Sequence, residues 1–391
     1  MYIPFLKLDT QSCTDFMEDD VPPPVSLRRD SGEGEAAASV SEVTPPEERN
    51  LMRNVDGTSC FMDALLVAVF MPVESHALDA LLFEPAEGGE PAARTHVRKI
   101  MQSVSGVVRG TAWCKSFDTL RSALCVGPDG GKFCMGQQDP AEFFQYLLGG
   151  ACLFHTKVVE TKSYSNRMEV ETREEPQRFE SLSHGAVSDL SAVFPVVEAG
   201  DVPANEYGLL SKSVRTDFMH GGTLVFTREK VPGSAAPLCY GERDPATRAY
   251  VITVKSGSGA DVRMRLCSII VWNGVAISGG AETCGHYAAY VYMSNQRQWL
   301  FFDDAHPSGR AQLMPVMDTP ETWPHTPRYV YGRSATTGKT AVYDKSTQVM
   351  MLFETEEEQA AHRARFAGDM FSLWRPSAHG VLFIYSREPP L

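Results

Sequence analysis

The sequence has no Cys-x-x-Cys pair, although it contains nine cysteines. Zinc sites built from closely spaced cysteines are therefore excluded, and we expect no metal and no cofactor. An odd number of scattered cysteines also argues against a disulfide framework and favours a reducing compartment. We expect a protein of the cytoplasm, or of the cytoplasm and the nucleus, with at least one reactive thiol. The cysteines occupy positions 13, 60, 114, 125, 134, 152, 239, 267 and 284.

Long apolar runs and an excess of basic residues are also missing. No run of about 18 or more apolar residues occurs, so we expect no helix across a bilayer. The first residues, MYIPFLKLDTQSCTDF, lack a charged segment followed by a long apolar core, so no secretory signal is expected. The formal net charge is −13, whereas a nucleic-acid-binding protein needs a basic surface. Membranes and nucleic acids are therefore not expected partners.

What is present is the composition of a globular protein. The chain has 391 residues, of which 43% are hydrophobic and 22% charged, enough for one large domain or two ordinary ones. Residues 1–50 differ from the rest, because they hold eleven acidic and four basic residues and the strings VPPPV and SGEGEAAASVSE. Such a segment buries too little apolar surface to offset the entropy of ordering. We expect an acidic, mostly disordered N-terminal arm, followed by a monomeric globular unit.

The period of the hydrophobic pattern changes along the globular part. Helical patterns fill 51–154, mixed patterns fill 155–248, and alternating strand-like patterns dominate 249–391. Helices followed by a sheet predict an α+β fold. The predicted helices cover 60–70, 93–108, 114–125, a segment with Asp139 as N-cap, Pro140 at N1 and Glu142 at N3, and 355–374, and the last predicted strand covers 380–386.

Cys60 lies where a polar, Gly-containing turn enters an apolar helix, in the string DGTSCFMD. At a helix N-terminus, unpaired N–H groups and the positive end of the dipole favour the thiolate form of a cysteine. The same N–H groups can stabilise an oxyanion. Cys60 is therefore a candidate nucleophile. The alternative is a buried, inert cysteine at the start of a helix.

His286 and Asp303 occur in two strand-like segments that a short connection joins, GHYAAYVYM and QWLFFDD. If the tightest turn is centred on Ser294 and Asn295, an antiparallel hairpin places His286 directly opposite Asp303. Opposed residues share a face, so the carboxylate would hold the imidazole in one tautomer. A bulge or a longer loop would shift this register by one or two residues. Such a pair is also commonly structural.

Together, Cys60, His286 and Asp303 are the residue types of a thiol protease. The local strings resemble ubiquitin-specific proteases: GTSCFMDALLVAVF resembles the cysteine box of this family, and GHYAAYVYMSNQRQWLFFDD resembles its histidine box. GQQDPAEFFQYLL resembles its Gln-Gln-Asp helix, and GVLFIYS its closing strand. Within this family, the strings are most similar to the CYLD-like branch. The resemblance extends from about residue 50 to the end of the sequence.

The resemblance implies a papain-like fold of the ubiquitin-specific protease type. A helical thumb would span 51–154, a reduced, zinc-free fingers insertion 155–248, and a β-sheet palm 249–391, all within a catalytic domain of residues 51–391. The zinc-free expectation follows because the cysteine pairs of many relatives are missing. Ubiquitin, polyubiquitin chains and ubiquitinated proteins would be the partners.

The resemblance also implies residue roles. Cys60 would be the nucleophile, His286 the general base and acid, and Asp303 the orienting acid, with Asp304 as an auxiliary carboxylate. Gln138 and Asp139 match residues that the family uses near bound ubiquitin, although the helix cap alone also explains Asp139.

One departure affects the oxyanion site. Many relatives place an asparagine five residues before the nucleophile, but that position here holds Val55, with Asn54 one residue further away. Asn54 is a candidate oxyanion donor only if the loop follows a different path.

The expected function is deubiquitination, by thiol-dependent hydrolysis at the C-terminal glycine of ubiquitin. By analogy with the CYLD-like branch, linear or similarly extended lysine-linked chains would be preferred. Two alternatives remain: a catalytically impaired ubiquitin-binding pseudo-protease, which the Val55 departure motivates, and a protease for another ubiquitin-like modifier.

Overall fold

The structure is a computed structural model, and every structural statement below refers to the residues that it describes. Asn54 and the N-terminal arm predicted over 1–50 lie outside them. The described residues are 59–72, 76–84, 92–110, 117–126, 130–134, 136–182, 187–201, 209–229, 237–257, 259–276, 283–304, 312–323, 325–327, 329–333, 339–344, 349–368, 370–372 and 374–388.

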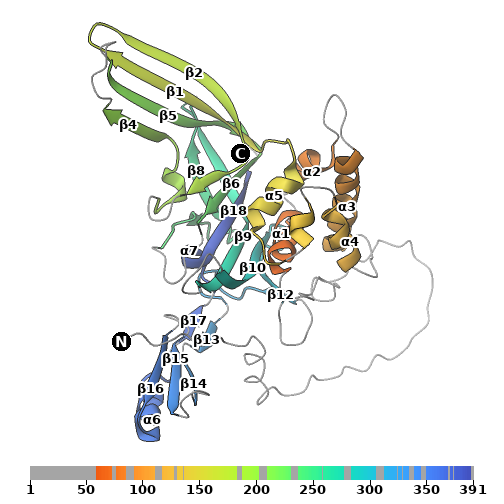
Figure 1. Ribbon diagram of the computed structural model, residues 1–391, viewed down its shortest axis with the longest axis vertical. Helices are drawn as coiled ribbons and strands as arrows, with labels where there is room; N and C mark the ends of the chain where they lie inside the picture. The colour runs from red at the N-terminus through yellow and green to blue at the C-terminus, as the bar shows by residue number, and fades with distance from the viewer. Residues whose placement is uncertain are drawn as a thin grey trace, which may run out of the picture.

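The helices of the first third gather on one side of the molecule (Figure 1). All eleven residues of the first helix are buried, as expected for a continuous apolar run, and Arg121 of the fourth helix reaches its first turn. Within the described residues, no helix has the length and apolar character needed to cross a bilayer. The helices are α1 (Cys60–Phe70), α2 (His76–Phe83), α3 (Ala92–Val108), α4 (Phe117–Leu124) and α5 (Pro140–Leu148), with a short 3-10 turn at Gly131–Cys134.

A large sheet forms the centre of the molecule. Its strands are β3 (Glu180–Leu182), β6 (Thr223–Arg228), β7 (Glu242–Arg243), β8 (Tyr250–Lys255), β9 (Asp261–Ala276), β10 (Thr283–Met293), β11 (Gln298–Asp303), β12 (Gln312–Pro315) and β18 (Gly380–Arg387). The main order is β12-β11-β10-β9-β18-β6-β3, with β8 on β9 and β7 on β8. Helices first and strands afterwards confirm the α+β prediction.

Helix α1 packs against this sheet and joins the two halves of the fold. Ser268 on β9 is fully buried and donates a hydrogen bond to the Ala68 carbonyl at 2.6 Å. Because the sheet and the helix share one apolar core, the N-terminus of α1 has a fixed position relative to β10.

A separate four-stranded sheet extends away from the helices (Figure 1). Its strands are β1 (Phe154–Tyr164), β2 (Met168–Gln177), β4 (Val196–Asp201) and β5 (Leu209–Gly221), in the order β2-β1-β5-β4. The first seven residues of β2 are exposed, so much of this sheet lies on the surface.

The C-terminal part forms a smaller unit at the opposite end of the molecule (Figure 1). Strands β14, β15 and β16 form a sheet that packs with α6, while β13 pairs with β17. These elements are β13 (His325–Pro327), β14 (Tyr329–Arg333), β15 (Thr340–Asp344), β16 (Val349–Phe353), α6 (Glu356–Arg365) and β17 (Met370–Ser372). Outside this unit, the short helix α7 (Pro376–His379) contacts β9 of the large sheet, and a 3-10 turn occurs at Leu190–Ala192.

The helix predicted over 355–374 is too long. It begins as expected, with a capping box between Thr355 and Glu358, but it ends at Arg365. Gly368 has a φ of 92°, a left-handed conformation that an α-helix cannot contain, and Met370–Ser372 forms β17. The glycine redirects the chain, so that apolar residues predicted to continue the helix form a strand instead.

The predicted register of the hairpin is wrong by two residues. Ala289 pairs with Phe302 and Tyr292 with Trp299, so the ladder would place Ala288, not His286, opposite Asp303. The turn is longer than a two-residue turn, and Arg297 takes a positive φ of 50° in it. A shift of two residues preserves the face on which a side chain lies. His286 and Asp303 therefore remain on one face as diagonal neighbours.

Candidate active site

Cys60 lies at the first position of α1, and its surroundings fix that helix start. Arg121 donates to the Ser59 hydroxyl at 2.9 Å and forms an ion pair with Asp63 at 2.9 Å. The Ser59 hydroxyl donates to Asp63 Oδ2 at 3.0 Å. Although Asp63 is completely buried, it thus has polar partners one turn below Cys60. This network fixes the direction in which the first N–H groups of α1 point.

His286 lies on β10 with its ring held from two sides. Its Nε2 is 2.7 Å from Asp303 Oδ1, and the buried Trp374 ring meets the imidazole edge to face with centroids 5.7 Å apart. Because Nε2 faces the carboxylate, Nδ1 is the nitrogen left for the sulfur of Cys60. The structure thus brings together Cys60, His286 and Asp303, which are far apart in the sequence.

The electrostatics of His286 follow from these neighbours. Burial lowers the pKa of His286, but hydrogen bonds to Asp303 and Cys60 and the charges of both groups more than compensate and raise it to about 10. The imidazole is therefore protonated at neutral pH. A protonated imidazole beside a sulfur is the arrangement that supports a reactive thiolate.

Asp304 differs sharply from Asp303. Its side chain is completely buried next to the buried Asp63, with which it shares a hydrogen bond, and Oδ1 is 3.4 Å from His286 Nε2. Burial and the charge of Asp63 raise the pKa of Asp304 to about 9, although His286 lowers it. Asp304 is therefore a neutral acid near pH 7, whereas the auxiliary role that the resemblance implies for it is that of a carboxylate.

Gln137 is a site residue that the sequence analysis missed. Its side-chain nitrogen lies 3.6 Å from Cys60 Sγ and also donates to the Gly285 carbonyl, next to His286. The amide therefore connects the loop before α5 with Cys60 and with β10, the strand that carries His286. The available signal was position, since Gln137 immediately precedes the two residues that the resemblance selected.

Those two residues, Gln138 and Asp139, follow Gln137 directly in the chain. Gln138 is half-buried. Asp139 caps α5 by accepting from Ala141 N at 2.7 Å, while Glu142 pairs with Lys132 at 3.0 Å. The predicted cap at the start of α5 is thus confirmed for Asp139.

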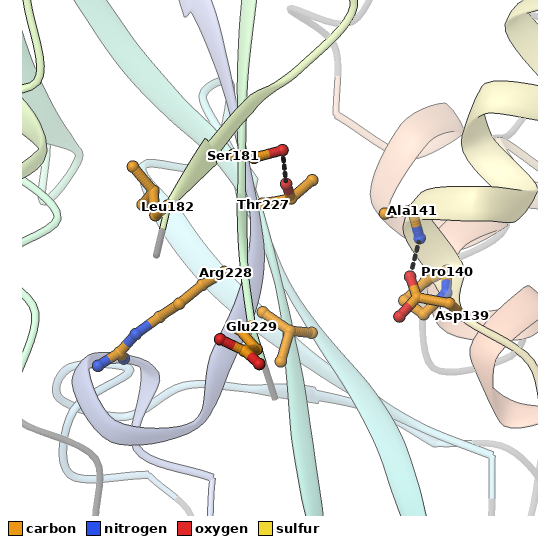
Figure 2. Close-up of a pocket in the computed structure, with 9 residues that line it drawn as sticks. Asp139, Pro140, Ala141, Ser181, Leu182, Thr227, Arg228 and Glu229 are labelled. Atoms are coloured by element: carbon orange, nitrogen blue, oxygen red, sulfur yellow. Dashed lines mark hydrogen bonds between the residues drawn. The ribbon is translucent and has the colours of Figure 1, made fainter. Parts of the chain in front are cut away.

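A cleft separates the start of α5 from the large sheet (Figure 2). Asp139 and Pro140 line its helical side, and Thr227, Arg228 and Glu229 its sheet side. Its volume of about 320 Å³ is near the lower end for ligand sites. Asp139 follows Gln137 by two residues, and Gln137 contacts Cys60, so the helical wall of the cleft begins close to the candidate nucleophile.

Two groups among the described residues have the donor atoms for a metal ion. One is His286, Asp303 and Asp304 of the site itself, and the other is His155, Glu174 and His220 on the four-stranded sheet.

Comparison with known proteins gives similarity only at the level of structure. No protein-family model matches the chain, and neither does any curated protein. The chain is similar to the SAGA DUB module of Ubp8, Sgf11, Sus1 and Sgf73 bound to ubiquitin aldehyde, at 12% identity and a TM-score of 0.48, covering 90% of this chain and 72% of that chain. It is also similar to a yeast SAGA DUB module carrying an Sgf73 mutant, at 13% identity and a TM-score of 0.49, covering 88% and 70%.

Proposed function

We propose that this chain is a cysteine-type deubiquitinase that hydrolyses isopeptide and peptide bonds at the C-terminal glycine of ubiquitin. The observation that carries the proposal is the convergence of Cys60, His286 and Asp303 near a cleft between helices and sheet. The distance from His286 Nε2 to Asp303 Oδ1 is 2.7 Å. The strings around these residues, which resemble ubiquitin-specific proteases, indicate the substrate.

The chemistry follows from the positions of the groups. The Cys60 thiolate attacks the carbonyl carbon of the terminal glycine and forms a tetrahedral oxyanion. The His286 imidazolium gives its proton to the leaving lysine amine, and a thioester remains on Cys60. His286 then takes a proton from water, which attacks the thioester and releases the carboxylate of ubiquitin and the free enzyme. Asp303 keeps the ring in the tautomer that these transfers need.

The cleft supplies a path for the substrate. A terminal Gly-Gly segment is the narrowest peptide and fits a restricted passage between α5 and the sheet. Asp139 lines the helical side of this passage and Gln138 directly precedes it, so both would contact the ubiquitin tail. The CYLD-like features of the strings add the proposal that linear and extended lysine-linked chains are cleaved fastest, which a panel of diubiquitins tests.

Reaction with ubiquitin that carries a C-terminal electrophile tests the function. We expect one covalent adduct per chain, detected as a mass increase, and no adduct with probes built on other ubiquitin-like modifiers. Measurable ubiquitin binding without an adduct would identify a pseudo-protease and contradict the proposal. An adduct only with another modifier would keep the chemistry and change the substrate.

We further propose that the Gln137 amide is an oxyanion donor. One N–H bonds to the Gly285 carbonyl, and the nitrogen lies 3.6 Å from the sulfur, where the developing oxyanion forms. Gln137→Glu keeps the shape but removes the donor, so we expect kcat to fall by about 10²–10³-fold with little change in KM. Gln145→Ala, on the exposed face of α5, is the matched control. An unchanged kcat in Gln137→Glu would eliminate this role.

A further inference from the structure

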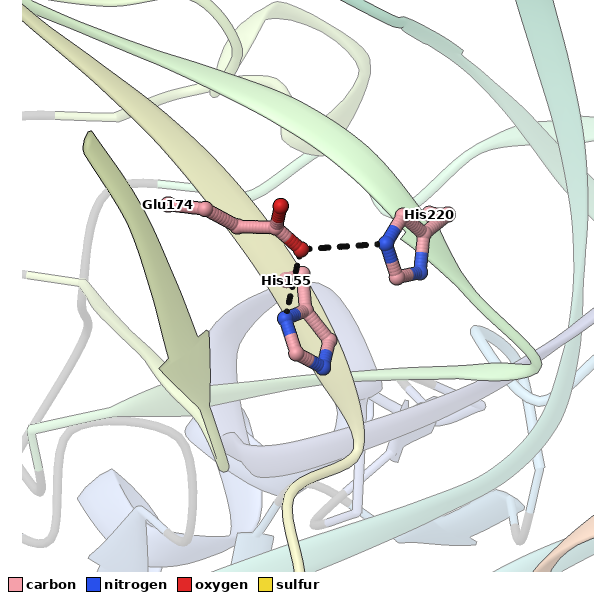
Figure 3. Close-up of side chains that lie close together, drawn as sticks. All are labelled: His155, Glu174 and His220. Atoms are coloured by element: carbon pink, nitrogen blue, oxygen red, sulfur yellow. Dashed lines mark hydrogen bonds and ion pairs between the residues drawn. The ribbon is translucent and has the colours of Figure 1, made fainter. Parts of the chain in front are cut away.

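A second cluster of ionisable side chains, which shares no residue with the candidate active site, lies on the four-stranded sheet, and Figure 3 shows its three members. Glu174 Oε1 is 2.9 Å from His155 Nδ1 and 3.2 Å from His220 Nε2. The two imidazole rings stack at 25° with centroids 4.6 Å apart. One carboxylate oxygen and two ring nitrogens thus converge on a single point from three strands.

The register of the strands explains the convergence. His155 on β1 pairs directly with His220 on β5. On the other side, His155 pairs with Pro176 on β2, and Glu174 is two residues from that position, on the same face. The ladder itself, and not a flexible loop, therefore places the three side chains together.

The distances suit a small transition-metal ion. Zinc binds imidazole nitrogen and carboxylate oxygen at about 2.0–2.2 Å, so tetrahedral ligands lie roughly 3.4 Å apart. The observed 2.9 and 3.2 Å are close to this separation, and all three donor atoms lie within 4.8 Å of one another. Two imidazoles and one carboxylate are donors typical of zinc.

The surroundings also favour an ion. Because Nδ1 of His155 faces Glu174, Nε2 carries the ring proton when Nδ1 binds a metal, and Cys152 Sγ lies 3.4 Å from Nε2 to accept it. Metal-bound histidines usually donate their second N–H in this way, which fixes the tautomer.

We propose that His155, Glu174 and His220 bind one divalent zinc ion, which links β1, β2 and β5 at the end of the sheet next to α5. The His155 and Glu174 side chains are 31% and 48% exposed, so an ion can enter from solvent, and a water molecule or a partner's side chain completes the coordination. The site differs from the cysteine-pair zinc sites that the sequence excludes. It is also independent of the proposed hydrolytic function.

Zinc titration of the full chain, freed of metal by a chelator, tests this site by competition with a chromophoric indicator. We expect the wild type to bind one equivalent more than Glu174→Gln and His220→Ala, and to gain thermal stability that these variants do not gain. Glu175→Gln removes the same charge from the next position of β2, where Glu175 pairs with Arg173, and should behave as the wild type. Comparing the variants with the wild type separates zinc bound at this site from zinc bound by cysteine thiols elsewhere in the chain.

Cobalt(II) provides a second measurement that does not depend on stability. We expect the visible absorption of tetrahedral cobalt with wild type and Glu175→Gln, at lower intensity or absent with Glu174→Gln. Equal zinc stoichiometry in the wild type, Glu174→Gln and His220→Ala would overturn the proposal and leave the cluster as two histidines that form ion pairs with Glu174.

Discussion

Cys60→Ala is expected to abolish hydrolysis of ubiquitin conjugates, with a fall in kcat on the order of 10⁴–10⁶, the range found when a nucleophile is removed from a hydrolase. The reason is that Cys60 is the thiol whose hydrogen bond and charge act on the His286 ring. Cleavage of diubiquitin, followed as the release of monoubiquitin, measures the loss.

The Cys60→Ala variant should still fold and bind ubiquitin, because the change removes one sulfur from a helix that is buried along its length. Cys239→Ala, at an exposed thiol, is the matched control and should retain wild-type rates. Residual turnover above one hundredth of the wild-type rate in Cys60→Ala would show that another group is the nucleophile.

Local signals made two of the helices in the first half of the chain predictable. The apolar run over 60–70 and the cap formed by Asp139 and Pro140 depend on neighbouring residues, and the structure has both features. The hairpin register depends on the conformation of the turn, and the turn residues Ser294–Arg297 contain no Asn-Gly or similar signal that specifies one turn type. The predicted register was therefore wrong by two residues. Because the error is an even number of residues, His286 and Asp303 still lie on the same face of the sheet.

Contacts between distant segments were beyond the sequence. Gln137 approaches Cys60 across 77 residues and Gly285 across 148, and neither contact leaves a periodic pattern. The His155, Glu174 and His220 cluster depends on the pairing of three strands, so no local spacing indicates it. A search for metal motifs by cysteine spacing could not find a site whose ligands are brought together by strand register.

Asp303→Asn and Asp304→Asn are expected to have very different effects, although the residues are adjacent. Asp303 bonds to His286 as a charged carboxylate, and an asparagine there presents an amide that favours the wrong tautomer. We expect kcat/KM to fall by about 10³–10⁴-fold, as in other triads that lose this charge. Asp304 is already neutral at pH 7, and asparagine has nearly the shape of a protonated aspartic acid, so we expect a loss of less than about tenfold.

The pH profile of the Asp303→Asn variant separates an electrostatic effect from a loss of structure. In the wild type, the His286 imidazolium persists until the pH approaches its pKa of about 10, so the alkaline decline of kcat/KM should begin only at high pH. Removing the charge of Asp303 removes a cause that raises this pKa, and the alkaline decline should therefore move to lower pH. Asp304→Asn should leave it nearly unchanged. An Asp304→Asn variant as impaired as Asp303→Asn would contradict this division of roles and mean that the buried acid orients the histidine together with Asp303.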